Sequence, residues 1–194
     1  MPAPRDLALL TGRLVLGGYL AAHGAQKLFG SFDGYGIEAT SAGFDRLGLQ
    51  PGGFFARVAG VSELGGGVLV ALGAAQPVGP AVLAGTMAVA SSTHLDNGPF
   101  STKSGYELPL TNLATALALG VAGPGSLSFD RLTGFRLPRP LRRVIVGGAV
   151  ATSALSLAMV LRARRDAADA APAAPEDESV GSSEGAGEGA AADG

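Results

Sequence analysis

Three ionisable side chains lie inside the first apolar segment of the chain. Arg13, His23 and Lys27 stand among aliphatic residues between Leu7 and Phe29. On a helix they share an arc of roughly 80°, because each residue advances the helix by about 100°. An ionisable group at the centre of a bilayer costs about 3 kcal/mol on insertion scales, so such groups face other helices or a wet cavity. The segment therefore predicts both a membrane location and a place for chemistry.

Later apolar segments contain acidic residues that can balance these cations. Glu63 lies near the middle of the second segment, and Glu107 opens the fourth. A buried carboxylate beside a cation keeps its charge. We therefore expect one buried polar cluster, with His94 as a further candidate, that binds a polar or quinone-like ligand or relays protons. Its predicted members are Arg13, His23, Lys27, Glu63, Glu107 and Asn112.

Ordinary structural roles remain open for these residues. Lys27 and Arg13 lie towards the ends of their segment and can extend to the lipid headgroups. His23 can be a packing residue, and His94 can lie at the membrane interface. Glu107 can stabilise the start of a helix through the helix dipole. Each residue therefore needs a structural test.

The composition limits the cofactors. The 194 residues include no cysteine, so the chain has no thiolate metal site, and a redox role needs a bound cofactor or a partner. No metal site is expected. A haem held by His23 and His94 is disfavoured, because two histidines in a whole chain match that pattern too easily by chance. Quinone stays as the candidate cofactor, and no nucleic-acid partner is expected.

Five apolar segments organise the chain, and each is expected to be helical because an open strand edge cannot lie in lipid. The connection 30–53 is long enough to contain a structured re-entrant or amphipathic piece, whereas 75–77 is a tight turn between antiparallel neighbours. Glycines at 65–67 predict a close-packing surface, not a phosphate loop. The five segments are 6–29, 54–74, 78–94, 106–122 and 144–161.

Charge separates the body of the chain from its end. Residues 166–194 contain eight acidic residues and no basic one, and their composition predicts a disordered tail. Arginines are concentrated in the connection before the fifth segment, which favours a cytoplasmic amino terminus. The arginines after that segment oppose this orientation, so the side of the tail stays open. We expect a multi-pass protein of the cell (inner) membrane.

Four motifs in order are similar to those of the DoxX family of small four-helix membrane proteins. The resemblance covers about residues 7–132. It rests on Arg13, on His-Gly-x-x-Lys, on Glu-x-x-Gly-Gly and on Gly-x-Gly-x-x-x-x-Asp. These positions are Arg13, His23, Gly24, Lys27, Glu63, Gly66, Gly67, Gly123, Gly125 and Asp130.

The resemblance implies a membrane four-helix bundle over 1–135. The chain departs from the family pattern in its basic linker and fifth apolar helix over 136–165 and in the disordered acidic tail over 166–194, so the expected fold is all-α with these additions. The resemblance also implies a redox-associated membrane subunit that meets a quinone or a sulfur compound in an oxidoreductase or oxidative-stress complex. Other membrane or redox proteins would be its partners. The alternative is a non-catalytic membrane scaffold or assembly factor. Whether the chain is itself catalytic stays open.

Overall fold

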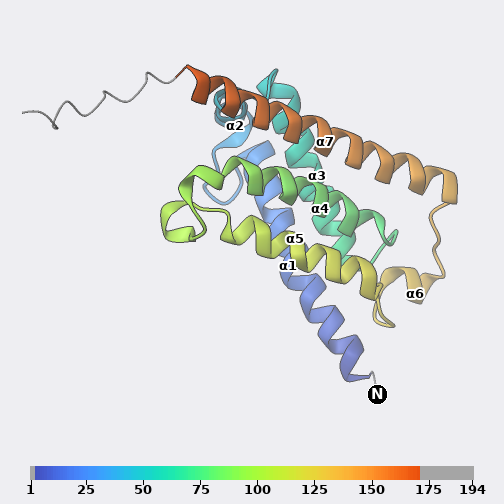
Figure 1. Cartoon of the computed structure of the whole chain (residues 1–194). Helices are drawn as coiled ribbons and strands as arrows, with labels where there is room; N and C mark the ends of the chain where they lie inside the picture. Colours follow the sequence, from blue (N-terminus) through green and yellow to red (C-terminus); the bar gives the residue numbers. More distant parts are fainter. Residues whose placement is uncertain (1–2, 171–194) are drawn as a thin grey trace, which may run out of the picture.

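The computed structural model describes residues 3–170, and within that range the chain is helical and contains no strand (Figure 1). Two short helices and two 3-10 turns, Leu95–Asn97 and Ser101–Lys103, lie between the long helices. The long helices are α1 (Pro4–Phe29), α3 (Gly52–Leu72), α4 (Val78–Thr93), α5 (Glu107–Ala122) and α7 (Arg139–Asp169). The short helices are α2 (Gly36–Arg46) and α6 (Phe129–Thr133).

Four of the long helices form a closed ring of neighbours. α1 packs along α3, α3 against α4, α4 against α5, and α5 against α1. α7 lies outside this ring against α4, along one side of the molecule in Figure 1. The centre of the ring is apolar, and α1, α3, α4 and α5 all contribute to it. Its buried residues are Leu16, Leu20, Val70, Leu83, Ala84, Met87, Ala116 and Leu119.

Glycines bring α1 and α3 unusually close. A Cβ atom added at Gly17 would lie 2.5 Å from the carbonyl oxygen of Gly67, and one added at Gly67 would lie 2.6 Å from the carbonyl oxygen of Gly17. Gly24 meets the backbone of Leu64 in the same way. Small residues allow backbones to approach and drive helix contacts where lipid removes the hydrophobic advantage. The predicted packing surface at 65–67 is confirmed for Gly67, and for Gly66, which faces Leu83 of α4.

The helices agree closely with the predicted segments, except at the carboxyl end. The connection 30–53 contains α2, and 75–77 is the turn between α3 and α4. The fifth helix was predicted over 144–161, but α7 is longer and runs through both flanks. Pro140 suits its first turn, and the alanines and arginines after position 161 are strong helix formers.

The first residues of the predicted tail are therefore helical, as far as Asp169, which corrects the expectation for that stretch. The rest of the predicted disordered tail, 171–194, lies outside the described residues.

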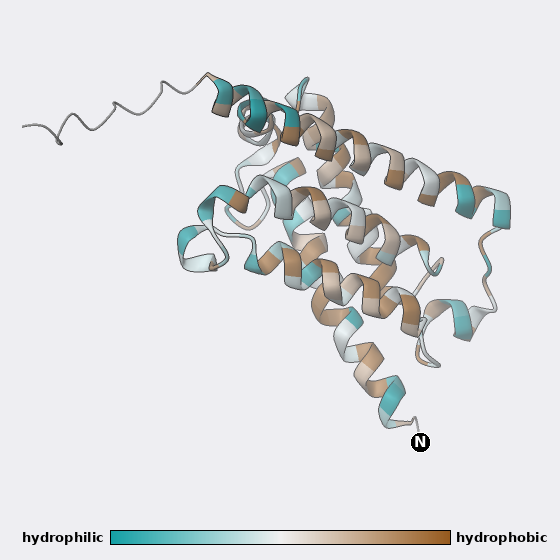
Figure 2. Cartoon of the chain, viewed as in Figure 1, coloured by the Kyte–Doolittle hydropathy of each residue, from teal (hydrophilic) through white to brown (hydrophobic). Residues whose placement is uncertain are grey.

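Two of the described helices, α3 and α7, are long and apolar enough to cross a membrane. α4 and α5 are shorter apolar helices of 16 residues each. Figure 2 shows apolar residues along the middle of α7 and polar residues at both of its ends. This distribution suits a helix that leaves its ends in the headgroup regions of a bilayer.

Candidate functional site

An ion pair joins α1 to α3. The Nζ atom of Lys27 donates to the Oε2 atom of Glu63. Glu63 is 4% exposed, while the Lys27 side chain is 27% exposed. The close glycine contacts of the two helices allow these side chains to meet. A buried carboxylate is tolerated when a cation compensates it, so the pair accounts for Glu63 in the middle of an apolar helix.

A cavity of about 540 Å³ lies beside this ion pair, with walls from α3, α4 and α7. Phe44 of α2 and Leu49 after α2 line one part of the cavity, and Ile145 of α7 lines another. Most lining side chains are aliphatic or aromatic. The polar groups include Lys27, Glu63, His94 and several hydroxyls. Small-molecule sites commonly have this form, with apolar walls and a few placed polar groups.

The polar groups offer a small set of chemical actions. The Lys27 ammonium can donate a hydrogen bond to a carbonyl oxygen, and the His94 imidazole can donate or accept one. The Glu63 carboxylate can accept a proton or a hydrogen bond. Lys27 lies in the last turn of α1, and His94 directly follows the last turn of α4, so both lie towards the same end of the cavity. The arrangement can therefore hold a ligand with an oxygen-bearing head and an apolar body.

The two histidines differ in their surroundings. His94 lines the cavity. The His23 ring instead packs edge-on against Tyr19, with the two ring centroids 4.4 Å apart. His23 is half-buried one helical turn before Lys27 and is not among the residues that line the cavity. The structure therefore favours the packing role for His23 and places His94 on the wall of the same cavity as the ion pair.

Arg13 lies apart from the cluster in which it was expected. It is 3% exposed, and its Nη2 atom donates to the carbonyl oxygen of Leu127 at 2.5 Å. Its Nε and Nη1 atoms have no hydrogen-bond partner among residues 3–170. Arg13 is about 21 Å from Lys27 along α1, at about 1.5 Å per residue. Because α1 and α3 run antiparallel, Arg13 lies opposite Gly73 at the carboxyl end of α3, ten residues after Glu63.

Glu107 and Asn112 also lie outside the cavity lining. The Glu107 carboxylate accepts hydrogen bonds from the backbone N–H of Ser101 at 2.9 Å and from its hydroxyl at 2.5 Å. Glu107 is exposed, so its role is to fix the turn before α5. Asn112 is half-buried on α5, and its side chain has no hydrogen bond among residues 3–170. The single cluster predicted from the sequence is therefore reduced to Lys27 and Glu63, joined by His94.

A second polar contact, around Asp130, was not assigned a role from the sequence. The Asp130 carboxylate accepts the backbone N–H groups of Ala75 at 2.9 Å and Gln76 at 3.0 Å. Its own N–H donates to the carbonyl oxygen of Gly73 at 3.3 Å. These bonds fasten the segment after α5 onto the turn between α3 and α4. The Gly-x-Gly-x-x-x-x-Asp motif was the available signal for this contact.

Asp130→Ala should lower the stability of the protein by about 1–3 kcal/mol, because two backbone donors in a sheltered turn lose their acceptor. Asp166→Ala is the matched control, since Asp166 is exposed near the end of α7. The measurement is the midpoint of thermal unfolding in mild detergent, followed by helical circular dichroism. Equal midpoints for the two variants would show that the Asp130 contact does not stabilise the fold.

Comparison with known proteins identifies one family. The DoxX family model matches residues 8–95. None of the curated proteins and none of the solved structures matches the chain. The matched range confirms the resemblance over α1 to α4 and contains Lys27, Glu63 and His94.

Proposed function

We propose that the protein is a redox-associated subunit that lies in the membrane and binds a quinone-like ligand. The proposal starts from the match of residues 8–95 to the DoxX family model. The family is membrane-associated and linked to redox or stress-related roles. The main observation that supports this proposal is the Lys27–Glu63 ion pair at the wall of a largely apolar cavity. A sulfur compound with an oxygen-bearing head is the second ligand class that suits this wall.

The placement in the membrane follows from the helices. We propose that α1, α3, α4 and α5 are the DoxX-like four-helix bundle and that α7 is an additional spanning helix. The amino terminus lies in the cytoplasm and the protein in the cell membrane. The arginines before and at the start of α7 support this orientation, since basic residues are retained on the cytoplasmic side.

A quinone suits the cavity in shape and in chemistry. Its head has two carbonyl oxygens, which accept hydrogen bonds from groups such as Lys27 and His94, and its isoprenoid chain suits aliphatic walls. Reduction of a quinone to a quinol takes up two electrons and two protons. Glu63 and Lys27 line the cavity and can transfer protons to the bound quinone. The electrons must come from a bound cofactor or a partner, because the chain has no cysteine to supply a thiol donor.

Binding of a short-chain benzoquinone to the purified protein in nanodiscs tests the proposal. Glu63→Gln removes the carboxylate that positions the Lys27 ammonium and should raise the dissociation constant at least about tenfold, which corresponds to about 1.4 kcal/mol. Lys103→Gln is the matched control, because Lys103 is exposed in the turn before α5 and should leave the affinity unchanged.

Equal affinity of both variants and the wild type would contradict the site. Absence of saturable quinone binding, together with stoichiometric co-purification of a partner protein, would instead support the membrane scaffold or assembly factor.

A further inference from the structure

A second pocket, of about 480 Å³, lies at the end of the molecule away from Lys27. It is formed by α6, the segment after it and the first turn of α7, and it reaches the turn between α3 and α4 at Gln76. Arg5 and Asp6 at the start of α1 bond to the neighbouring segment at Ala122 and Ser126, which places this pocket at the amino-terminal end of α1. Four arginines line it: Arg131, Arg136, Arg139 and Arg142.

The arginines are not neutralised within the described part of the chain. None of the four forms an ion pair with any of residues 3–170, where the ion pairs are Lys27–Glu63 and Arg164–Asp96. Asp130 also lines the pocket, but its two carboxylate oxygens already accept the N–H groups of Ala75 and Gln76. The side chains that line the pocket therefore carry a net positive charge, which attracts an anion.

The guanidinium groups indicate the chemical class of that anion. Arginine has a planar fork of donors that matches the oxygens of a phosphate, and such bonds are strengthened by the charges. The positive end of the α7 dipole lies at Arg139, where the helix begins, and adds to the attraction. A phosphate group is therefore the anion that best suits a pocket lined by four arginines.

The apolar surroundings indicate the source of the phosphate. Phe135 and Leu137 form part of the pocket wall beside the arginines. Phe135 is 42% exposed, and Leu132, which follows the lining Arg131 on α6, is 77% exposed, so exposed apolar side chains accompany the arginines. A lipid can place its phosphate among the arginines and its acyl chains over these side chains. A free phosphate would make no use of the apolar part.

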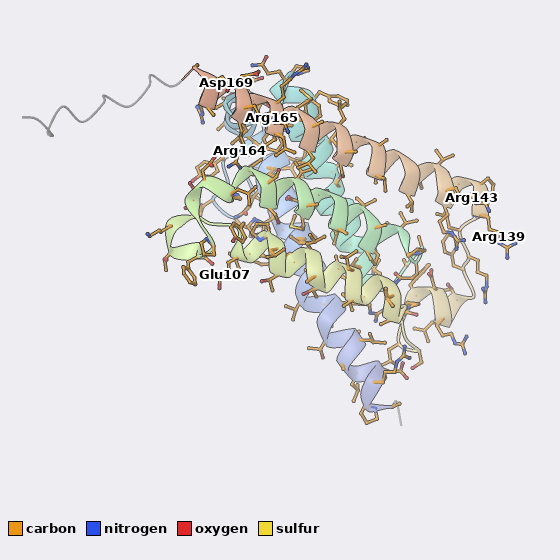
Figure 3. The ribbon with its side chains drawn as sticks, viewed as in Figure 1. Glu107, Arg139, Arg143, Arg164, Arg165 and Asp169 are labelled. Atoms are coloured by element: carbon orange, nitrogen blue, oxygen red, sulfur yellow. The ribbon has the colours of Figure 1, made fainter. Side chains whose placement is uncertain are left out.

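The two ends of α7 are far apart. Asp169 ends α7 about 45 Å from Arg139, at about 1.5 Å per residue. Figure 3 shows Arg139 and Arg143 at one end of α7 and Arg164, Arg165 and Asp169 at the other. With α7 across a bilayer, the pocket therefore lies at one membrane surface and the basic residues at the other end of α7 lie at the opposite surface.

We infer that the arginine pocket between α6 and the start of α7 binds the phosphate group of an anionic membrane lipid. Basic pockets between membrane helices on the cytoplasmic side bind such headgroups. The inference rests on the membrane placement proposed above and is independent of the quinone site. Bound lipid would anchor the start of α7 to the ring of helices, from which the extended segment 134–138 separates it.

Native mass spectrometry of the full-length protein in mild detergent tests this inference. The protein is titrated with phosphatidylglycerol, with phosphatidylcholine and with inorganic phosphate. The pocket variant carries the four substitutions Arg131→Gln, Arg136→Gln, Arg139→Gln and Arg142→Gln. The control variant loses the same charge elsewhere, through Arg46→Gln, Arg143→Gln, Arg162→Gln and Arg165→Gln.

The wild type and the control variant should retain phosphatidylglycerol at least about tenfold more strongly than phosphatidylcholine, and the pocket variant should lose this preference. Equal loss in both variants would overturn the inference, because it would indicate a general charge effect. Binding of inorganic phosphate without a preference for anionic lipid would overturn the lipid source.

Two further measurements keep the test interpretable. The unfolding midpoint of the lipid-free pocket variant should match that of the wild type, and the variant should still bind quinone. If the fourfold variant does not fold, Arg136→Gln with Arg139→Gln is measured against Arg162→Gln with Arg165→Gln, and the same loss of preference is expected. Failure of quinone binding with intact lipid binding would contradict the proposed function and leave the lipid site supported.

Discussion

Gly17→Ala should disrupt the contact between α1 and α3 and lower the stability of the protein by about 1–3 kcal/mol, the usual cost of overpacking. The added Cβ atom would lie 2.5 Å from the backbone nitrogen of Ala71 and 2.5 Å from the carbonyl oxygen of Gly67. Both are backbone atoms, so neither can rotate away. The two helices must separate, and the Lys27–Glu63 ion pair must lengthen with them.

Gly18→Ala is the matched control on the same helix. A Cβ atom at Gly18 has no neighbour within 4 Å among the described residues. Within a helix, alanine is also more favourable than glycine by about 1 kcal/mol, so this variant should be as stable as the wild type or more stable. The readout is the thermal unfolding midpoint in mild detergent. If Gly17→Ala unfolds at the same temperature as Gly18→Ala, the close approach of α1 and α3 does not stabilise the fold.

Lys27→Met should destabilise the protein by about 3–5 kcal/mol, the cost of leaving one member of a buried ion pair without its partner. Methionine keeps most of the length of the lysine side chain and removes only its charge. Glu63 would then be an uncompensated carboxylate in an apolar helix. The same unfolding measurement follows the effect, with Lys103→Met as the exposed control.

A double variant separates this charge effect from lost packing. Adding Glu63→Gln to Lys27→Met removes the orphaned charge, so the double variant should be more stable than Lys27→Met alone. Glu63→Gln is also measured alone. If the stability change of the double variant equals the sum of the changes in the two single variants, Lys27 and Glu63 do not interact.

Much of the fold could be predicted from the sequence, because the apolar segments are bounded by clear turn signals. Gly30, Gly73 and Gly123 have positive φ values and end α1, α3 and α5 close to the predicted positions. The extent of α7 could not be predicted from hydropathy, because its two ends are helical but charged. In those turns alanine and arginine sustain the helix without any apolar pattern.

The candidate site could be predicted only in part. The arc shared by Arg13 and Lys27 correctly identified the face of α1 that meets other helices. The arc does not show which residue of α3 each side chain lies opposite. The antiparallel register decides that, and it places Lys27 at Glu63 and Arg13 at Gly73.

His94 could not be placed from the sequence either. The position of His94 directly after α4 does not show that α7 packs against α4. In the structure α7 supplies one wall of the cavity that His94 lines. The contact of α7 with α4 joins segments far apart in the chain and follows from tertiary packing alone.

Photolabelling tests the quinone site most directly. The full-length protein in liposomes is exposed to a photoreactive benzoquinone, and the labelled residues are located by mass spectrometry, with unlabelled quinone as competitor. The account predicts saturable labelling on α3, α4 and α7 around the cavity beside Lys27 and Glu63, and its loss in Glu63→Gln but not in Lys103→Gln. Labelling that does not saturate, or that falls only on surfaces away from the cavity, would contradict it.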